Sequence, residues 1–124
     1  MAKIFLLAGT IGGFLSVTLG AFAAHELKKH LTVPLLNTFK VAVEYQFYHS
    51  LALILIALTL LLKPETSQFQ TAGWFIVAGI ILFSGSLYTI ALTNNSAFGP
   101  VTPLGGVFLL IGWFYFIWGA WKAF

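Results

Sequence analysis

The fold is decided by the stretch VEYQFYHSLALILIALTLLL, which covers residues 43–62. Its second part, Leu51–Leu62, contains only Leu, Ile, Ala and Thr but is just 12 residues long. A helix rises ~1.5 Å per residue and needs ~20 apolar residues to cross ~30 Å of hydrocarbon, so this part cannot span a bilayer alone. The span is complete only if Val43–Ser50 is included. The stretch therefore predicts a transmembrane helix that carries Gln46 and His49 into the membrane.

Three further apolar stretches have a similar length, Ile4–Ala24, Ala72–Thr93 and Pro103–Trp121. Charged residues make up only 7% of the chain, whereas an ordinary soluble domain has roughly 25%. This composition excludes a soluble globule, because so few charges cannot cover its surface, and a disordered chain, which needs low hydrophobicity. None of the stretches alternates between apolar and polar residues, so a transmembrane barrel is excluded as well.

We therefore predict an all-α integral membrane protein with a single membrane domain over residues 1–124. Its four transmembrane helices are expected at about 4–24, 43–62, 72–93 and 103–121, in an up-down bundle whose loop 25–42 is partly helical. The first helix resembles a signal peptide, with Ala21-Phe22-Ala23 in the place of a cleavage site. We expect it to be retained, because its apolar run exceeds the usual ~7–15 residues and carries glycine and serine at packing intervals.

The strongly polar residues of the predicted helices collect on one side of the membrane. An up-down bundle places loops 25–42 and 94–102 on that side, and both termini with loop 63–71 on the other. Counted from Val43, Gln46 lies roughly 4–5 Å and His49 roughly 9 Å inside the membrane, and Tyr88 reaches a similar depth on the antiparallel third helix. With residues at the nearby helix ends, these form a candidate polar site that consists of His25, Glu44, Gln46, His49, Tyr88 and Thr102.

Two interpretations of this candidate polar site stay open. Gln46 and His49 share a helix face, whereas Glu44 points about 140° away from His49, so a direct Glu44–His49 pair is not expected. A charge at the centre of a membrane helix costs ~2.5–3.5 kcal/mol, and ionisable groups there mark functional sites, which favours a ligand or proton site. A neutral His49 can instead join neighbouring helices through hydrogen bonds worth ~0.6–2 kcal/mol each.

Small residues predict where the helices approach each other closely. The first helix carries Gly9 and Gly13 as a G-x-x-x-G pair, and the fourth carries Gly105 and Gly112 at seven-residue spacing. Glycine lets two helix backbones pack together in a membrane. We attribute these positions to packing within the bundle, with a homodimer face as the alternative. The predicted helix-packing residues are Gly9, Gly13, Gly85, Gly105, Gly106 and Gly112.

Four sequence blocks on the polar side resemble the successive motifs of a known family. They are AFAAHELK at 21–28, VEYQFYHSLA at 43–52, FSGSLY at 83–88 and TPLGG at 102–106. In this order they are similar to family 423 of the domains of unknown function, the YgdD/YwdK-like small bacterial membrane proteins, which are similar to the animal transmembrane protein 256. The resemblance covers essentially the whole chain. It implies a small multi-pass membrane protein and brings no activity, substrate or cofactor with it.

The sequence lacks motifs for catalysis, metal binding or nucleotide binding. In HELKKH, residues 25–30, the histidines are five residues apart rather than four as in H-E-x-x-H, which places them about 140° apart on a helix. No metal site is therefore predicted. No P-loop, dinucleotide fingerprint or G-x-S-x-G occurs, and the chain has no cysteine. Because these motifs are missing, we expect no cofactor and no enzymatic activity. We also expect no nucleic-acid partner, since the lysines are dispersed rather than clustered in a basic patch.

The first loop and the membrane orientation each leave two alternatives. We expect a solvated connection in the first loop. Leu27, Leu31 and Leu35 recur at four-residue steps, so a short interfacial helix that touches anionic headgroups is the alternative. Pro34 could also open a helix that continues into the second span.

Three lysines fall on each side of the membrane, so the positive-inside rule does not decide the orientation, and the terminal amine favours cytoplasmic termini.

The leading hypothesis is a non-enzymatic protein of the bacterial cytoplasmic (inner) membrane. It would modulate membrane or envelope properties, or bind membrane lipids, another membrane protein or a second copy of itself. The alternative is a small proton- or solute-coupled transporter or channel whose route is lined by Gln46, His49 and Tyr88. An enzyme that acts on lipid would need His25 and Glu44 and ranks third.

Overall fold

The computed structural model describes all 124 residues, which form four long helices and no strand. Helix α1 covers Ala2–His25, α2 covers Val33–Leu62, α3 covers Ser67–Thr93 and α4 covers Val101–Ala123. Two short 3₁₀ turns, η1 at Leu27–Lys29 and η2 at Ser96–Phe98, lie in the connections after α1 and α3. Each long helix has the length and apolar composition needed to cross a membrane. The predicted all-α membrane fold with four transmembrane helices is confirmed.

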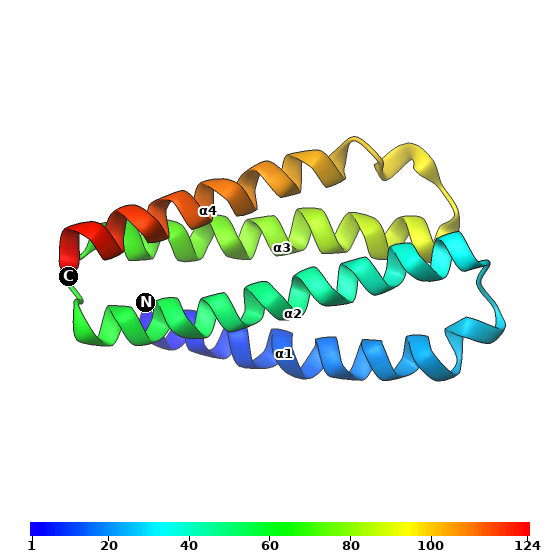
Figure 1. Ribbon diagram of the computed structural model, residues 1–124, viewed down its shortest axis with the longest axis horizontal. Coiled ribbons are helices and arrows are strands. Elements are labelled where there is room, and N and C mark those ends of the chain that lie inside the picture. Colours follow the sequence, from blue (N-terminus) through cyan, green and yellow to red (C-terminus); the bar gives the residue numbers. More distant parts are fainter.

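Successive helices run antiparallel and lie in the order α1, α2, α3, α4 across the molecule (Figure 1). Both termini and the α2–α3 turn lie at one end, here named the terminal end; the other two connections lie at the opposite end, here named the loop end. Each helix packs mainly on its neighbours in the sequence. As a result, α1 and α4 are the outer helices of this up-down bundle and share no comparable interface with each other.

Helix α2 is longer at its N-terminus than predicted, because it begins at Val33 rather than near residue 43. The Thr32 side chain caps it by accepting a hydrogen bond from the backbone N–H of Leu35, and Pro34 occupies its first turn. Proline suits this turn, since the N–H that it lacks would have no helical partner there. Of the alternatives left open for the first loop, a separate interfacial helix is not formed, since Leu35 already belongs to α2, and Pro34 opens the helix that continues into the second span.

The start of α4 also differs from the prediction. The helix begins at Val101, directly after Pro100, rather than near residue 103, so Thr102 lies inside its first turn. The physical reason is that Pro100 already has a helical backbone conformation, with φ −65° and ψ −22°. The Thr102 hydroxyl instead forms a hydrogen bond with the hydroxyl of Ser86 on α3. At the preceding helix end, Asn94 closes α3 in the left-handed conformation with φ 50°.

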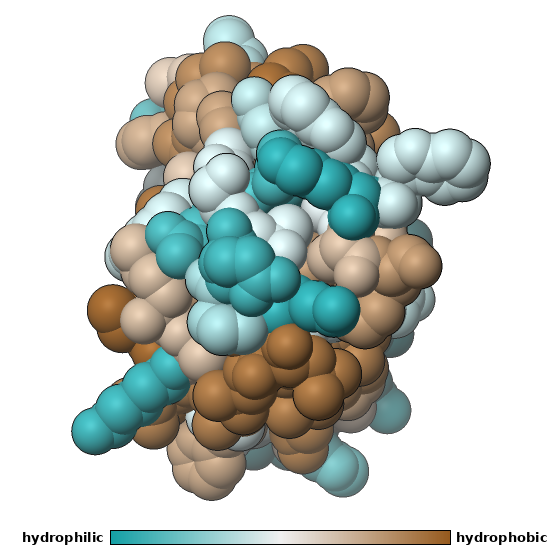
Figure 2. Space-filling model, turned by 90° about the vertical axis from the view of Figure 1, so that its left-hand side faces the viewer, coloured by the Kyte–Doolittle hydropathy of each residue, from teal (hydrophilic) through white to brown (hydrophobic).

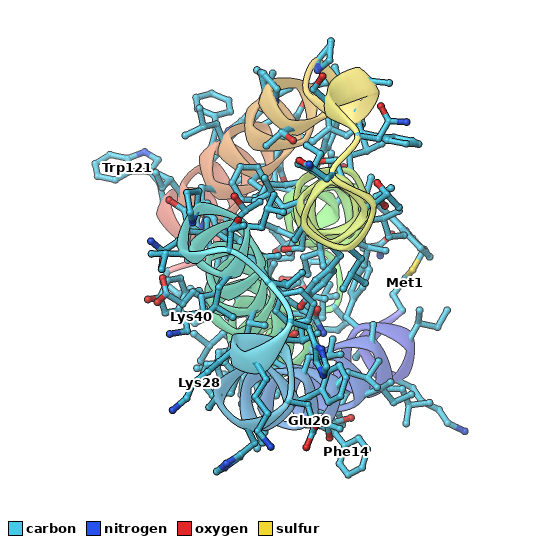
Figure 3. The ribbon with its side chains drawn as sticks, turned by 90° about the vertical axis from the view of Figure 1, so that its right-hand side faces the viewer. Met1, Phe14, Glu26, Lys28, Lys40 and Trp121 are labelled. Carbon is cyan, nitrogen blue, oxygen red and sulfur yellow. The ribbon has the colours of Figure 1, made fainter.

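Two hydrophobic clusters hold the helices together. The terminal cluster lies toward the terminal end and consists of Phe5, Leu53, Ile56, Ala57, Leu60, Phe69, Ala72, Ile76 and Leu109. The loop cluster lies at the loop end and consists of Ala23, Leu27, Phe39 and Ala91. Large apolar side chains also cover the outside: Phe14 and Trp121 point away from the bundle (Figure 3) and are 72% and 87% exposed. Such a surface suits lipid rather than water.

Three of the predicted packing glycines lie in close helix contacts. A Cβ atom on Gly9 would lie 2.6 Å from the carbonyl oxygen of Ser50, and one on Gly105 would collide with the backbone of Phe83. A Cβ on Gly112 would likewise collide with the neighbouring helix. At these positions only glycine allows the observed approach between helices.

The other three glycines do not mark close contacts, so that part of the prediction is wrong. A Cβ on Gly13 or Gly85 would meet no atom within 4 Å, and one on Gly106 would lie at an ordinary distance of 3.8 Å from Phe83. A Cβ on Gly13 would face open space rather than an atom of α2, the main neighbour of α1. Gly85 lines a cavity. In α1 it is Gly12, beside Gly13, that lies against Ser50.

Polar and charged side chains gather at the two ends of the bundle. At the loop end, Lys28, Lys40 and Glu26 project outward (Figure 3). At the terminal end, a hydrophilic patch is surrounded by apolar side chains (Figure 2). The apolar middle and the polar ends are the pattern expected when the helix axes lie along the membrane normal.

Candidate functional site

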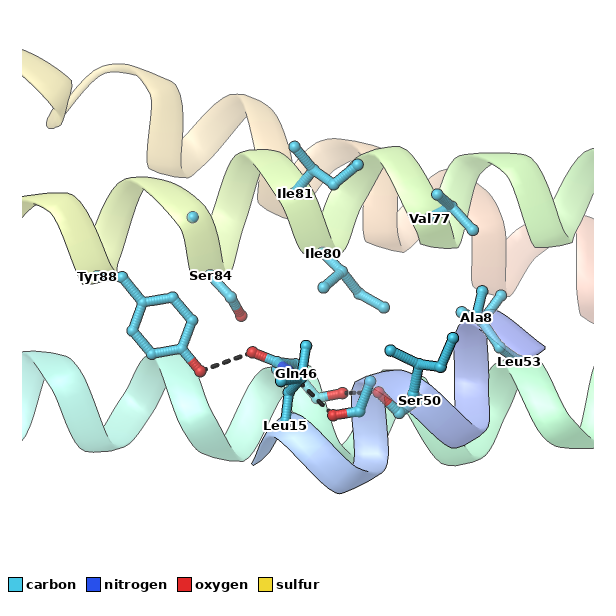
Figure 4. Close-up of a pocket in the computed structure, with 13 residues that line it drawn as sticks. Ala8, Leu15, Gln46, Ser50, Leu53, Val77, Ile80, Ile81, Ser84 and Tyr88 are labelled. Atoms are coloured by element: carbon cyan, nitrogen blue, oxygen red, sulfur yellow. Dashed lines mark hydrogen bonds between the residues drawn. The ribbon is translucent and has the colours of Figure 1, made fainter. Parts of the chain in front are cut away.

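A cavity of about 420 Å³ lies between α1, α2 and α3, midway along the helices (Figure 4). Its floor includes the buried residues Gln46, Ser50 and Leu53 of α2. Its rims carry exposed apolar side chains, with Ile11 of α1 56% exposed and Ile81 of α3 65% exposed. The cavity therefore opens sideways, toward the region that lipid occupies around a transmembrane bundle.

The cavity is bounded at both ends by contacts that join α1 to the rest of the bundle near α3. Toward the terminal end, Phe5 of α1 fills the space beside Gly73 and meets Trp74 edge-on, with ring centroids 5.2 Å apart. Toward the loop end, Ala23 of α1 and Ala91 of α3 both belong to the loop cluster. The walls between these contacts are made partly of small residues, which leave the space unfilled: Ala8, Gly12, Ser84 and Gly85.

Gln46 joins three helices at one end of the cavity. Its Nε2 donates a hydrogen bond to the carbonyl oxygen of Gly12 on α1, at 2.9 Å, and its Oε1 accepts one from the hydroxyl of Tyr88 on α3, at 2.6 Å. The Tyr88 ring packs edge-on against Phe39, with centroids 4.9 Å apart. The structure thus brings together two residues of the candidate polar site, Gln46 and Tyr88, on the wall of one cavity.

Two buried serines complete this polar end. The Oγ of Ser50 donates to the carbonyl oxygen of Gln46 at 2.6 Å, and the Oγ of Ser84 donates to the carbonyl oxygen of Ala42 at 2.8 Å. Both hydroxyl hydrogens are thereby used within the protein. The cavity lining contains no charged residue and no histidine, and its other end is apolar, with Ala8, Leu53 and Val77. The cavity therefore changes from polar to apolar along the bundle axis (Figure 4).

Ser84 is not among the residues that the sequence predicts for the candidate polar site. Its position four residues before Tyr88 puts both side chains on one face of a helix, and this spacing is the signal that could have identified it.

His49 contacts α4 and does not line the cavity. Its Nδ1 lies 2.7 Å from the carbonyl oxygen of Tyr45, and the indole Nε1 of Trp113 donates to its Nε2 at 3.0 Å. An indole N–H can only donate, so Nε2 accepts and Nδ1 carries the ring proton, which it donates to Tyr45. Both nitrogens of a neutral imidazole are thus satisfied. This geometry favours the interpretation of His49 as a contact between helices.

The remaining residues of the candidate polar site lie elsewhere. His25 and Glu44 are exposed, and Glu44 lines a separate shallow groove between α1 and α2. Thr102 bonds to α3, as described above. The six residues therefore do not form one site, because neighbouring positions on α2 face different helices: Gln46 and His49 differ by about 60° around the helix axis.

The chemistry that this cavity offers is hydrogen bonding beside apolar surface. Its lining lacks Asp, Glu, His, Cys and Lys, so it holds no acid–base pair. No group of three or more His, Asp or Glu side chains in the structure is arranged to hold a metal ion.

Comparison with known proteins now assigns the chain to a family. Residues 19–106, which include Gln46, Ser84 and Tyr88, match the family described as "Protein of unknown function (DUF423)". The chain belongs to this family. It is 41% identical over 111 residues to the UPF0382 membrane protein YwdK of Bacillus subtilis, with 90% of each chain covered. It is 37% identical over 123 residues to a UPF0382 membrane protein of Haemophilus influenzae, with 99% of this chain and 98% of the relative covered.

A UPF0382 membrane protein of Staphylococcus aureus is 41% identical over 116 residues, with 93% of each chain covered. The names of these relatives agree with the four transmembrane helices, and the protein is a multi-pass membrane protein of this family. No solved structure matches the chain significantly.

Proposed function

We propose that this protein is a non-enzymatic membrane protein that binds an amphiphilic molecule from the bilayer in the cavity between α1, α2 and α3. The observation that carries this proposal is the graded polarity of a cavity that opens sideways. A molecule with one polar group and an apolar chain would place the group beside Gln46 and Tyr88 and the chain beside Leu53 and Val77. Binding of this kind would let the protein modulate the composition or properties of the membrane.

The size and lining of the cavity support this proposal. Its volume of about 420 Å³ falls within the ~300–1,000 Å³ of typical ligand sites. Such sites are lined mainly by apolar side chains and have a few polar groups that orient the ligand, which is the distribution found here. The exposed rim residues Ile11 and Ile81 would let a chain enter from the lipid without crossing a polar barrier.

The proposed location is the bacterial cytoplasmic membrane, with both termini in the cytoplasm. Support for the membrane type comes from the bacterial relatives, which are named membrane proteins. The proposed partners are membrane lipids, and an outer helix, α1 or α4, is the surface that a second copy or another membrane protein would contact.

A small proton- or solute-coupled carrier is the alternative function. It is favoured by Gln46 and Tyr88, which line the cavity. It is disfavoured by His49, whose two ring nitrogens bond to Tyr45 and Trp113 outside the cavity. Flux of protons or small solutes into liposomes that contain the purified protein would support the carrier over the binding protein.

Photo-crosslinking tests the binding proposal. The purified protein is placed in liposomes with a hexadecanol that carries a diazirine in its chain, and modified residues are identified by mass spectrometry after irradiation. We expect modification of the cavity walls, at Val77 and Ile80 above all. Gly85→Phe should reduce this modification several-fold, because a side chain at this open position would fill the cavity.

Gly13→Phe is the matched control for this experiment. Gly13 also has no neighbour within 4 Å but lies outside the cavity lining, so the same bulk added there should leave the modification unchanged. Equal modification of every lipid-facing helix surface, unaffected by Gly85→Phe, would contradict the proposal, since it would show only the lipid that surrounds any membrane protein.

A further inference from the structure

We infer that the cavity selects an amphiphile whose head is neutral and carries a hydroxyl group, such as a long-chain alcohol. It would bind this head in preference to an anionic head and to one that only accepts hydrogen bonds. The inference rests on the proposed function, binding of an amphiphile in the cavity, and adds the chemistry of the head. It follows from the hydrogen-bond donors and acceptors that remain free at the polar end.

Almost all donors at the polar end are already used. The Tyr88 hydroxyl donates to Gln46, the Ser84 hydroxyl to Ala42 and the Ser50 hydroxyl to the Gln46 carbonyl. A glutamine amide has two N–H donors, and one of those on Gln46 is used by Gly12. The second N–H of Gln46 is therefore the one side-chain donor left for a ligand.

Acceptors at the same end are more numerous. A hydroxyl oxygen that donates its hydrogen keeps two lone pairs, so the oxygen of Tyr88, which is only partly buried, can still accept from a ligand. Ser50 and Ser84 are each only 1% exposed, so their oxygens are less accessible to a ligand. The Oε1 of Gln46 accepts from Tyr88 and keeps a second lone pair. A ligand group that donates a hydrogen bond therefore finds the oxygens of Tyr88 and Gln46 as partners, and a hydroxyl can also accept from the remaining Gln46 N–H.

An anionic head fits this end poorly. Carboxylates, sulfates and phosphates only accept hydrogen bonds, and the cavity lining has one free side-chain donor and no cation. Taking a charge from water into such surroundings without a partner is costly. Counted from Val43, Gln46 lies roughly 4–5 Å inside the hydrocarbon, so a head bound there is also below the level at which hydrated headgroups lie.

Competition against the diazirine probe in the same liposomes tests this inference. Four molecules with the same chain length are compared: hexadecanol, the corresponding methyl ketone, hexadecane and hexadecyl sulfate. We expect hexadecanol to displace the probe at about a three- to tenfold lower concentration than the ketone or the alkane, the effect of one hydrogen bond in a membrane. Hexadecyl sulfate should displace it least.

In Gln46→Leu, the concentrations at which hexadecanol and the methyl ketone displace the probe should become more similar. This substitution removes the amide that holds the Tyr88 hydroxyl hydrogen, which then becomes a donor to a ketone. If Gln46→Leu does not fold, Gln46→Met takes its place, because methionine keeps the length of the glutamine side chain. Gln70→Leu, the same change on α3 outside the cavity lining, should leave the order of the four molecules unchanged.

The outcomes separate this inference from the proposed function. Suppose that Gly85→Phe reduces the labelling, but all four molecules displace the probe equally, or hexadecyl sulfate displaces it best. This result would overturn the preference for a neutral hydroxyl head and leave amphiphile binding intact. Labelling that is insensitive to Gly85→Phe and to all four molecules would overturn the proposed function itself.

Discussion

Gln46 and His49 lie one turn apart on α2, and their hydrogen bonds connect this helix to the three others. Gln46 bonds to Gly12 on α1 and to Tyr88 on α3, and His49 accepts from Trp113 on α4. Hydrocarbon gives helices little hydrophobic reason to associate, so packing and hydrogen bonds of this kind hold a membrane bundle together. The two side chains therefore differ in their surroundings: Gln46 borders a cavity, and His49 lies in a helix interface.

We expect the hydrogen bond between Trp113 and His49 to stabilise the fold by ~0.6–1.7 kcal/mol, the range found for side-chain hydrogen bonds between membrane helices. The test compares His49→Phe, Trp113→Phe and the double variant by unfolding in detergent micelles, since phenylalanine keeps an aromatic ring at each position. The double variant should lose less stability than the two single losses added together, by that amount. Strictly additive losses would contradict a direct bond.

His49→Phe also tests whether the histidine takes part in ligand binding. Because His49 lies outside the cavity lining, cross-linking of the diazirine probe should be unchanged in this variant. A strong reduction in a variant that still folds would place His49 in the binding site.

For individual residues, the sequence predicted how deep a polar side chain lies in the membrane better than it predicted which helix the side chain faces. Counting residues from the membrane surface identified Gln46, His49 and Tyr88 as polar groups inside the membrane, and Gln46 and Tyr88 do meet. The partner of His49 escaped this count, because Trp113 starts deeper in the membrane and reaches His49 through its long side chain. The face that each side chain takes depends on how the helices are rotated, and one sequence does not contain that rotation.

Helix α2 is longer than the hydropathy of the sequence indicates. It has 30 residues and is therefore ~45 Å long, more than the ~30 Å of hydrocarbon, so its first turns extend beyond the membrane at the loop end. Hydropathy places this segment outside the apolar stretch 43–62, because it contains polar residues such as Asn37 and Lys40. It is helical because Thr32 caps it and because Phe39 is buried in the loop cluster against Tyr88, a contact between residues distant in the sequence.

The glycine patterns likewise predicted close approach without identifying the side of the helix on which it occurs. The G-x-x-x-G pair of α1 is divided: Gly9 lies against α2, whereas Gly13 has no neighbour. Because α1 is an outer helix, only part of its circumference contacts another helix. Some of its small residues therefore lie in the contact with α2, and others lie outside it. The small residues outside the contact are available to lipid.

Two adjacent glycines of α4 give a direct test of helix packing. In Gly105→Ala the new Cβ would collide with the backbone of Phe83, which cannot move aside as a flexible side chain can, so α4 must shift away from α3. We expect a loss of ~1–3 kcal/mol in the free energy of unfolding, typical of overpacking. In Gly106→Ala the new atom would make an ordinary contact at 3.8 Å, and stability should be unchanged or slightly higher, because alanine favours helix.

Thermal unfolding of both variants in detergent measures this difference. Equal stability of Gly105→Ala and Gly106→Ala would contradict the close α3–α4 contact at Gly105.

For the whole molecule, the row-like order of the helices explains both the cavity and the exposed surface. Since α1 packs mainly on α2, it leaves a gap beside α3 wherever the facing residues are small, and the contacts at the two ends of the cavity prevent the gap from closing along its length. The same arrangement leaves most of α1 and α4 facing lipid. The sequence predicted the number of helices and the up-down order, but a lateral cavity depends on this lateral arrangement of helices, which hydropathy does not encode.

The orientation of the bundle in the membrane can be tested at its two ends, which carry equal numbers of lysines. Three lysines lie at the loop end, Lys28, Lys29 and Lys40, and three at the terminal end, Lys3, Lys63 and Lys122. The chain has no cysteine, so single cysteines that leave every lysine in place, introduced as His30→Cys, Ala97→Cys and Ser67→Cys, report on one exposed position each. With cytoplasmic termini, a membrane-impermeant maleimide added to intact cells should label the first two, which lie at the loop end, and not the third.

The equal number of lysines also means that the orientation should respond to small changes of charge. The positive-inside rule acts on lysines and arginines in short loops, and here it is balanced. Adding Asn95→Lys and Ala97→Lys to the His30→Cys and Ser67→Cys reporters would give the loop end an excess of positive charge and should move labelling from position 30 to position 67. If labelling does not change, lysine balance does not set the orientation, and the asymmetry must come from elsewhere in the bundle, such as the polar side chains that lie nearer the loop end.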